Sequence, residues 1–177
     1  KKNTYFKNLN KNKNLKKNKN LKKRIIGISW KTANQQFSSE RNVELKLLNP
    51  ILKEMNYNFI NLQYGDHSME IADCEKIANR KIFLEHRNDN FLNLEGLTMN
   101  IKKCDYVISI DNSIAHLSGF LKTPTFLMLP YVSEWRWLEN RSDTPWYETI
   151  RIFRQTKELD WAPVIYNLKN ELNSLSK

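Results

Sequence analysis

The stretch Cys104–Pro130, CDYVISIDNSIAHLSGFLKTPTFLMLP, holds two continuous apolar runs separated by a short helical pattern. Tyr106–Ile110 and Thr125–Leu129 have the pattern of strands that are buried on both faces, which is typical of a parallel sheet. The apolar residues between them recur at helical spacing: Ile114, Leu117 and Leu121. The stretch therefore predicts a strand–helix–strand unit at the centre of an α/β fold.

Polar residues gather where the first of these strands ends and the helix begins: Asp111, Asn112, Ser113 and His116. Ligands of open α/β sheets bind at the carboxyl ends of the strands, and a helix N-terminus favours a phosphate or a diphosphate. Asp111 would repel a phosphate, so we expect it to accept hydrogen bonds from sugar hydroxyls. Taken singly, each residue is also explained as a helix cap or a solvated side chain. Their combination at one strand end favours a binding site.

The rest of the chain continues the same alternation of strands and helices. Further strands are expected at Arg24–Trp30, Asn58–Gln63, Lys81–Leu84 and Arg151–Arg154, and further helices at Val43–Met55, Ser68–Asn79, Leu94–Cys104 and Asp160–Leu172. Pro50 predicts a break near Asn49. Short connections between alternating elements predict an α/β fold with a doubly wound, mainly parallel, Rossmann-like sheet. Neither standard glycine-rich phosphate loop is present in the sequence.

Charged residues follow two other predicted strands. A long polar loop, Lys31–Arg41, follows the first strand, and its end residues supply cations that suit a diphosphate. Asp66 and Glu70 follow the second strand and are expected at the same sheet edge as Asp111. Each of these four residues has a simpler explanation as a solvated side chain, a turn residue or a residue that favours the first helical turn.

An aromatic loop, YVSEWRWLENRSDTPWYET, occupies residues 131–149. Aromatic rings beside Arg136 and Arg141 are suited to stacking on the base or ring of a ligand. Rings in such a loop also commonly close a hydrophobic core or meet another domain. The sequence leaves these two explanations open.

The net charge of +10 is unevenly distributed along the 177 residues. Residues 1–24 hold ten Lys, one Arg and no acidic residue, whereas residues 25–177 hold 18 basic and 19 acidic residues. A folded part without basic excess argues against a nucleic-acid-binding domain. We expect residues 1–23 to be a leader or interdomain connector and residues 24–177 to be one domain.

Cysteine usage and hydropathy indicate the compartment. Cys74 and Cys104 have no metal-ligand spacing and are predicted to be free thiols in a reducing environment. No run of about eighteen apolar residues is present. We expect a cytoplasmic protein, either free or peripheral at the inner face of the membrane.

Six pieces of the sequence, in order, carry a family resemblance. They are IIGISWKT, Arg41-Asn42 before a helix, INLQYGD, CDYVISIDNSIAHLSG, TPTFLMLP and the tail WRW…PWY…FRQ…DW. Over about Ile25–Leu172 the chain resembles the C-terminal domain of heptosyltransferase-like glycosyltransferases, glycosyltransferase family 9, of the kind attached to tetratricopeptide repeats. Where this chain has Asn112, heptosyltransferases commonly have Thr.

The resemblance implies the C-terminal half of a GT-B architecture, which binds a nucleotide-sugar donor, ADP- or similar, without a metal or other cofactor. It implies that Asp111, Asn112, Ser113 and His116 line the donor diphosphate and sugar, with Lys31 or Arg41 as a cationic contact. Asp66 or Glu70 would lie near the nucleoside.

The resemblance also implies an inverting glycosyltransferase that transfers a heptose-like sugar to an acceptor hydroxyl. The base and the acceptor site would belong to an N-terminal Rossmann-like domain outside this chain. This chain would then hold no catalytic residue, and by itself it would bind the donor without transferring the sugar. The alternative is a non-catalytic nucleotide-sugar-binding or scaffold module of a repeat protein.

Overall fold

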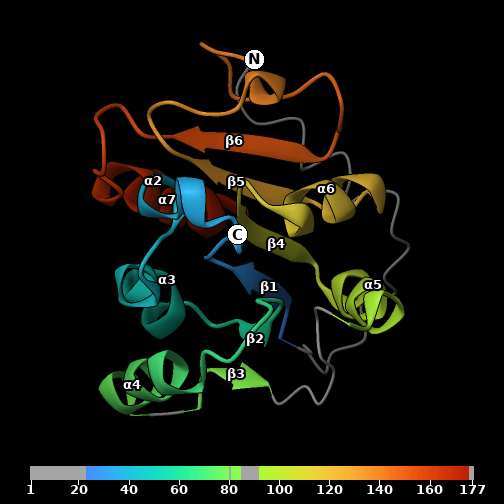
Figure 1. Cartoon of the computed structure of the whole chain (residues 1–177). Coiled ribbons are helices and arrows are strands. Elements are labelled where there is room, and N and C mark those ends of the chain that lie inside the picture. Colours follow the sequence, from blue (N-terminus) through green and yellow to red (C-terminus); the bar gives the residue numbers. More distant parts are fainter. Residues whose placement is uncertain (1–22, 80, 85–91, 176–177) are drawn as a thin grey trace.

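The computed structural model describes residues 23–79, 81–84 and 92–175. Within these residues, six strands form one parallel sheet in the order β3-β2-β1-β4-β5-β6 (Figure 1). The strands are β1 (Ile25–Ser29), β2 (Asn58–Asn61), β3 (Phe83–Leu84), β4 (Tyr106–Ile110), β5 (Thr125–Leu129) and β6 (Ile150–Arg154). Each strand pair is parallel, as the continuous apolar runs predicted.

The order of the strands reverses between β1 and β4. The chain moves outward from β1 through β2 to β3, then returns to place β4 on the other side of β1 and continues outward to β5 and β6. β1 pairs with β2 from Ile25 and with β4 from Ile26, so it is central and hydrogen-bonded on both sides. The reversal creates a topological switch point between the carboxyl ends of β1 and β4, the place where ligands of such folds bind.

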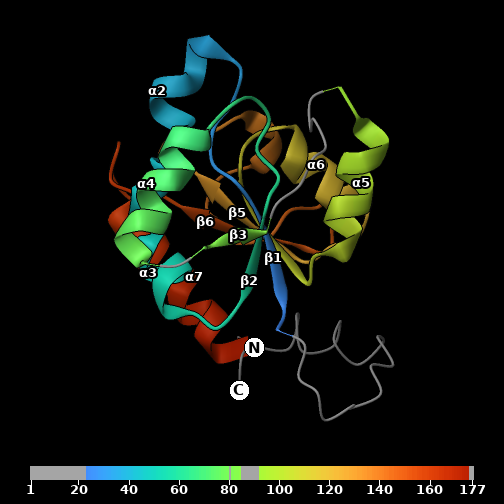
Figure 2. The same ribbon diagram turned by 90° about the horizontal axis from the view of Figure 1, so that it is seen from below.

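Helices cover both faces of the sheet. They are η1 (Gln35–Phe37), α2 (Ser38–Arg41), η2 (Leu45–Leu48), α3 (Asn49–Glu54), α4 (Ser68–Ala78), α5 (Leu94–Lys103), α6 (Ser113–Phe120), η3 (Trp135–Trp137) and α7 (Ala162–Leu175). Seen from below, α3, α4 and α7 lie on one side of the strands, and α5 and α6 on the other (Figure 2). This arrangement confirms the predicted doubly wound Rossmann-like fold.

Each face of the sheet has its own buried cluster. The side chains from η2, α3 and α7 pack against β1, β2 and β4 in the larger cluster, around Trp30 and Phe59. On the opposite face, α5 and α6 pack against Leu62 and Val107. A Cβ atom at Gly27 of β1 would lie 2.4 Å from Leu62 Cδ1 and 2.8 Å from Cys104 Sγ. Glycine is needed there because the side chains at the end of β2 and after α5 approach the β1 backbone this closely.

The segment after β1 differs from its prediction. The prediction of a loop across Lys31–Arg41 is wrong in part, because the segment forms the short helices η1 and α2. Asn34 caps η1, since its Oδ1 accepts a hydrogen bond from the Gln36 backbone N–H at 3.1 Å. A short cap-and-turn helix has no apolar stripe, so the hydrophobic periodicity did not show it.

Of two other predicted helix features, one is confirmed and one differs. The break predicted near Asn49 is confirmed, since η2 gives way to α3 there and Pro50 lies in the first turn of α3. Cys104, predicted within a helix, instead follows α5 with an extended backbone. The predicted leader and the polar run Glu85–Asn90 lie outside the described residues, apart from Lys23, the last residue predicted for the leader.

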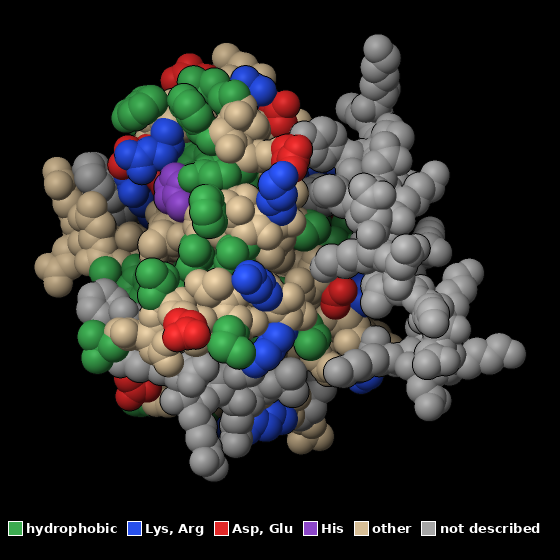
Figure 3. All heavy atoms as spheres, turned by 90° about the vertical axis from the view of Figure 1, so that its right-hand side faces the viewer, with side chains coloured by type: hydrophobic (Ala, Val, Ile, Leu, Met, Phe, Trp, Pro, Cys, Tyr) green, Lys and Arg blue, Asp and Glu red, His purple; other side chains and the backbone are tan. Residues whose placement is uncertain are grey.

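Figure 3 shows the side of the molecule that carries α5 and α6, where hydrophobic side chains lie among charged ones and gather toward the top of the view. The exposed large apolar side chains of the molecule include Phe120, Trp135 and Trp146. None of the helices in the described part of the chain is long and apolar enough to cross a membrane.

Candidate functional site

Asn112 links the two strands of the switch point. Its Oδ1 caps α6 by accepting from the Ile114 backbone N–H at 3.0 Å and also accepts from Ser109 Oγ at 3.0 Å. Its Nδ2 donates to Ser29 Oγ at 2.8 Å and to the Lys31 carbonyl at 3.2 Å. These four bonds use the full hydrogen-bonding capacity of the amide. Asn112 is therefore part of the framework that holds the carboxyl ends of β1 and β4 together, and its contact with a ligand stays a prediction.

Asp111 lies beside this framework and is only 3% exposed. Its Oδ1 accepts a hydrogen bond of 2.8 Å from the indole Nε1 of Trp137. Its Oδ2 is buried and accepts no hydrogen bond, although Arg41 Nη1 lies 3.4 Å away as an ion-pair partner. At that separation the pair is electrostatic and leaves the lone pairs of Oδ2 unused. Oδ2 of Asp111 can thus accept a further hydrogen bond, and the guanidinium of Arg41 lies next to it.

Arg41, at the end of α2, joins two carboxylates. Its Nη2 donates to Glu134 Oε1 at 2.6 Å, while its Nη1 faces Asp111. The hydrogen bond from Arg41 is the main reason why the pKa of Glu134 is lowered from its usual value. Arg136 Nη2 lies 3.5 Å from the other oxygen of Glu134. Arg41 therefore ties the segment after β1 to the aromatic loop across the end of β4.

His116 lies one turn into α6 and contacts two rings of the aromatic loop. Its Nδ1 is 3.1 Å from the Tyr147 hydroxyl, and its ring stacks on Trp137 with centroids 5.0 Å apart. Burial is the main cause that lowers the pKa of His116, and nearby Arg136 lowers it further, whereas Asp111 and Glu134 oppose the shift. This lowering of the pKa shifts the imidazole toward its neutral form at pH 7.

Lys31 and Glu70 pair with each other rather than facing the centre of the site singly. Glu70 Oε2 accepts from Lys31 Nζ at 2.7 Å and from Trp30 Nε1 at 3.1 Å, and its Oε1 accepts from the Leu45 backbone N–H at 2.9 Å. Burial by itself would raise the pKa of Glu70, but these three hydrogen bonds outweigh it and the pKa is lowered. Glu70 therefore joins β1, η2 and α4, while Lys31 is still one-third exposed.

Asp66 and Ser113 are both exposed at helix starts. Asp66 Oδ1 accepts from the Ser68 backbone N–H at 2.9 Å, and this bond lowers the pKa of Asp66. That geometry is a turn entering α4. Ser113 is the first residue of α6 and lies beside Asp111 and Asn112. Among the predicted residues, Asn112 contacts Lys31, and Asp111 contacts Arg41. His116 is connected to Asp111 through Trp137. Within the described ranges, no hydrogen bond or ion pair joins Asp66 to any of these residues.

Several residues of the cluster were not identified from sequence. Gln63, 2% exposed after β2, accepts at Oε1 from the backbone N–H groups of Trp30 and Lys31 at 2.9 and 2.8 Å. A polar residue that ends an apolar strand was the signal. Trp137 belongs to the aromatic loop that the sequence singled out, but its pairing with Asp111 had no local signal, and neither had the pairing of Glu134 with Arg41, because these partners are distant in sequence.

The aromatic loop divides between the two explanations left open for it. Trp137 is fully buried and packs in a cluster with Leu127 and Leu129, with Tyr147 against it. Trp135 and Trp146 are 72% and 57% exposed. The first pair closes the core, and the second pair is left for a ligand or another domain.

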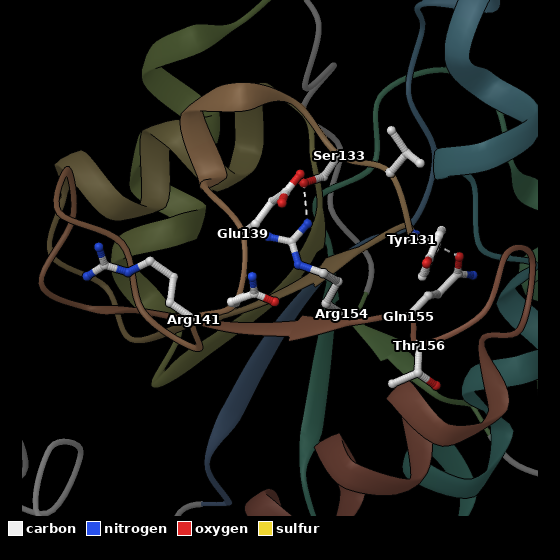
Figure 4. Close-up of a pocket in the computed structure, with 9 residues that line it drawn as sticks. Tyr131, Ser133, Glu139, Arg141, Arg154, Gln155 and Thr156 are labelled. Atoms are coloured by element: carbon white, nitrogen blue, oxygen red, sulfur yellow. Dashed lines mark hydrogen bonds between the residues drawn. The ribbon is translucent and has the colours of Figure 1, made fainter.

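A hollow of about 490 Å³ lies where β5 and β6 end (Figure 4). Arg154 projects into it and donates to Ser133 Oγ and to the Leu138 carbonyl, while Gln155 Oε1 accepts from the Tyr131 backbone N–H at 3.1 Å. Glu139 and Arg141 also line it. These contacts anchor the segment around η3 from the β6 side, while Arg41 and Asp111 anchor it from the α2 and β4 side.

Three cations of this region are each paired with a carboxylate: Lys31 with Glu70, Arg41 with Glu134 and Asp111, and Arg136 with Glu134. Lys31, Arg41 and Arg136 come from three different segments, and the N-terminus of α6 adds its dipole. Within the described ranges, no group of three or more His, Cys, Asp or Glu side chains is placed to hold a metal ion. The chemistry available to these residues is anion binding by cations and N–H groups, with Asp111 as the adjoining acceptor.

No family model matches the chain. The chain is similar to the curated protein named Protein FlbA from Caulobacter vibrioides, with 28% identity over 152 residues that cover 85% of this chain and 25% of that protein. The chain thus spans about a quarter of the length of this relative. Among solved structures, it is similar to a glycosyl transferase family 9 protein from Veillonella parvula, with a TM-score of 0.49 and 11% identity over 84% of this chain and 40% of that one.

Proposed function

We propose that this domain binds the nucleotide-sugar donor of an inverting glycosyltransferase, and that the donor diphosphate lies at the N-terminus of α6. The observation that carries the proposal is the meeting of Arg41, Asp111 and His116 beside the switch point between β1 and β4. Arg41 Nη1 lies 3.4 Å from Asp111 Oδ2, and Trp137 donates to Asp111 Oδ1 while stacking on the His116 ring. These residues come from separate elements, and local capping does not explain their meeting. The motif resemblance to family 9 glycosyltransferases supports the same assignment.

Binding of a diphosphate would replace partners that the cations now have. Arg41 is held by Glu134 and adjoins Asp111, and Lys31 is held by Glu70. A diphosphate carries more charge than one carboxylate and accepts bidentate hydrogen bonds from a guanidinium. Movement of Arg41 toward the diphosphate would uncover Oδ2 of Asp111, which has no hydrogen bond of its own. A sugar hydroxyl next to the diphosphate is a donor that suits this acceptor.

The same cations would serve the chemical step. As the sugar–phosphate bond breaks, negative charge grows on the leaving diphosphate, and fixed N–H groups and cations stabilise it without a metal. The acceptor hydroxyl needs a base, which we assign to an N-terminal domain of the GT-B kind outside this chain. The domain alone is then expected to bind the donor without transferring the sugar. A heptose-like donor and attachment to tetratricopeptide repeats belong to this proposal.

Calorimetry of the domain with ADP, UDP and GDP, each with and without EDTA, tests the proposal. At least one of the three should bind, with the same affinity in EDTA. Arg41→Met, Lys31→Met and His116→Ala should each weaken that binding by about five- to fiftyfold, since each removes a hydrogen bond or charge contact to the diphosphate.

Lys122→Met is the matched control, because Lys122 is exposed and pairs with Glu148. It should bind as the unaltered domain does. The proposal is wrong if none of the three nucleotides binds, or if EDTA abolishes binding. An equal loss in the control would show nonspecific attraction to surface charge instead of a site.

A further inference from the structure

Among the described residues, Tyr147 is the one hydrogen-bond partner of the His116 imidazole. Its hydroxyl lies 3.1 Å from His116 Nδ1, and its ring meets the imidazole edge-on with centroids 5.8 Å apart. Trp137 stacks on the imidazole at 5.0 Å. Two rings from the aromatic loop thus fix both the plane and one nitrogen of His116, while Nε2 has no protein hydrogen-bond partner in the part of the chain that the structure describes.

Gly119 makes room for this contact. It lies three residues after His116, inside α6, where glycine costs about 1 kcal/mol relative to alanine. A Cβ atom there would lie 2.6 Å from Cγ of the Tyr147 ring and 3.0 Å from Cδ1 of Ile150. Real Cβ atoms do not approach a ring carbon so closely, so any larger residue would push Tyr147 away from α6. The glycine is therefore explained by the approach of Tyr147 and not by helix formation.

The hydroxyl of Tyr147 decides which imidazole nitrogen carries the proton. The phenol O–H is a good donor, whereas the imine nitrogen of a neutral imidazole is a much better acceptor than a phenol oxygen. The favoured arrangement is therefore O–H donating to Nδ1. Since the other ring nitrogen then holds the proton, His116 presents Nε2–H as a donor.

We propose that Tyr147 is a positioning residue that holds His116 in the Nε2–H tautomer, so that Nε2 donates a hydrogen bond to an anionic ligand at the N-terminus of α6. The role of Tyr147 toward the ligand rests on the proposed function, whereas its effect on the tautomer does not. Tyr147 acts through His116 and need not touch the ligand.

The charges around His116 are compatible with a neutral donor. Asp111 at the end of β4 and Glu134 before η3 favour protonation of the ring, while Arg136 within η3 and burial disfavour it, and burial is the largest influence on the pKa. The net lowering of the pKa favours the neutral ring. His116 then contributes a directed hydrogen bond, and the charge comes from Lys31 and Arg41.

The test combines nitrogen NMR of the histidine rings with binding of inorganic pyrophosphate. The chain has three histidines, so the signals of His116 are assigned by comparison with His116→Gln. In the unaltered domain, Nδ1 should have the shift of an unprotonated nitrogen and Nε2 that of a protonated one. Tyr147→Phe keeps the ring against Gly119 but removes the hydroxyl, and should give a mixture of tautomers and about two- to tenfold weaker pyrophosphate binding.

Gly119→Ala displaces the ring without removing the hydroxyl and should produce the same mixture and a similar loss. Tyr166→Phe is the matched control, because Tyr166 is 66% exposed on α7, and it should change neither measurement. The inference is overturned if Tyr147→Phe leaves the tautomer unchanged, or if the tautomer changes and pyrophosphate affinity does not. If pyrophosphate and the nucleotides all fail to bind the unaltered domain, the proposed function fails, while the NMR comparison still decides the effect of Tyr147 on His116.

Discussion

The carboxylates of Glu70 and Asp111 have similar neighbours, but only Glu70 has hydrogen-bond donors for both of its oxygens. Glu70 and Asp111 each accept a hydrogen bond from a tryptophan indole, Trp30 at 3.1 Å and Trp137 at 2.8 Å, and each adjoins one cation. Lys31 hydrogen-bonds Glu70 at 2.7 Å, whereas the nearest guanidinium nitrogen of Arg41 stays 3.4 Å from Asp111. Glu70 also accepts a backbone N–H at 2.9 Å, and Asp111 has an oxygen with no hydrogen bond.

The difference separates a structural carboxylate from one with unused capacity. Each hydrogen bond of Glu70 joins α4 to another segment of the fold, so its removal leaves three donors without an acceptor. Burial of an unsatisfied acceptor costs free energy, and native structures keep few of them. The spare oxygen of Asp111 is thus the feature of the site that folding alone does not explain.

Glu70→Ala should lower the free energy of unfolding by about 2–4 kcal/mol, because it leaves the Trp30 indole and the Leu45 backbone N–H without partners and Lys31 unpaired. Chemical denaturation measures the change. Asp73→Ala, on the exposed side of the same helix, is the control and should change stability by less than about 0.5 kcal/mol. Equal stability of the two variants would show that Glu70 is not the structural member of the pair.

The same carboxylate should contribute to acid sensitivity. The pKa of Glu70 is lowered in the folded state from its ordinary value of 4.5, so its contribution is present above pH 4.5 and is lost as the pH falls through the lower, folded-state pKa. Stability of the unaltered domain should therefore fall more steeply than that of Glu70→Gln below pH 4.5. Parallel acid-denaturation curves for the two proteins would contradict the lowered pKa.

Asp111→Asn should behave in the opposite way to Glu70→Ala. Asparagine can still accept from the Trp137 indole, and Arg41 keeps Glu134, so we expect stability to change by less than about 1 kcal/mol. Affinity for the nucleotide-sugar should fall at least tenfold more than affinity for the nucleoside diphosphate, since a charged acceptor's hydrogen bond is worth about 1.5–3 kcal/mol. Calorimetry with both ligands measures the difference, and equal losses would show that Asp111 does not contact the sugar.

Glu134→Gln should have the smallest effect, and it should be a gain. Glu134 holds Arg41 through a 2.6 Å hydrogen bond that a diphosphate would have to displace. Weakening this competitor should tighten diphosphate binding about two- to fivefold, with the larger gain at low salt because the competing interaction is a charge pair. Weaker binding would mean instead that Glu134 orients Arg41 for the ligand.

Much of this architecture was predictable from local patterns. The continuous apolar runs Tyr106–Ile110 and Thr125–Leu129 predicted buried parallel strands, and both form with every residue buried. The cap at Asn112 was predictable because Asn before an apolar helical stripe accepts from the helix backbone, as its 3.0 Å bond from Ile114 shows. These features depend on neighbours within a few residues, so sequence periodicity and side-chain type are enough to determine them.

The partners of the site residues were decided by the tertiary structure. Placing β4 beside β1 brings Ser29 and Lys31 to Asn112, 83 and 81 residues away, so the fold supplies the hydrogen-bond partners of this amide, while its contact with a ligand stays a prediction. The aromatic loop supplies Trp137 to Asp111 and Tyr147 to His116 across 26 and 31 residues. No local pattern encodes these contacts, because they follow from strand order and from the path of a loop without periodicity. Local patterns in the sequence were therefore enough to place Asp111, Asn112 and His116 at the end of β4 and the start of α6, whereas the packing of distant segments fixed the hydrogen-bond partners of each and left one oxygen of Asp111 without a hydrogen bond.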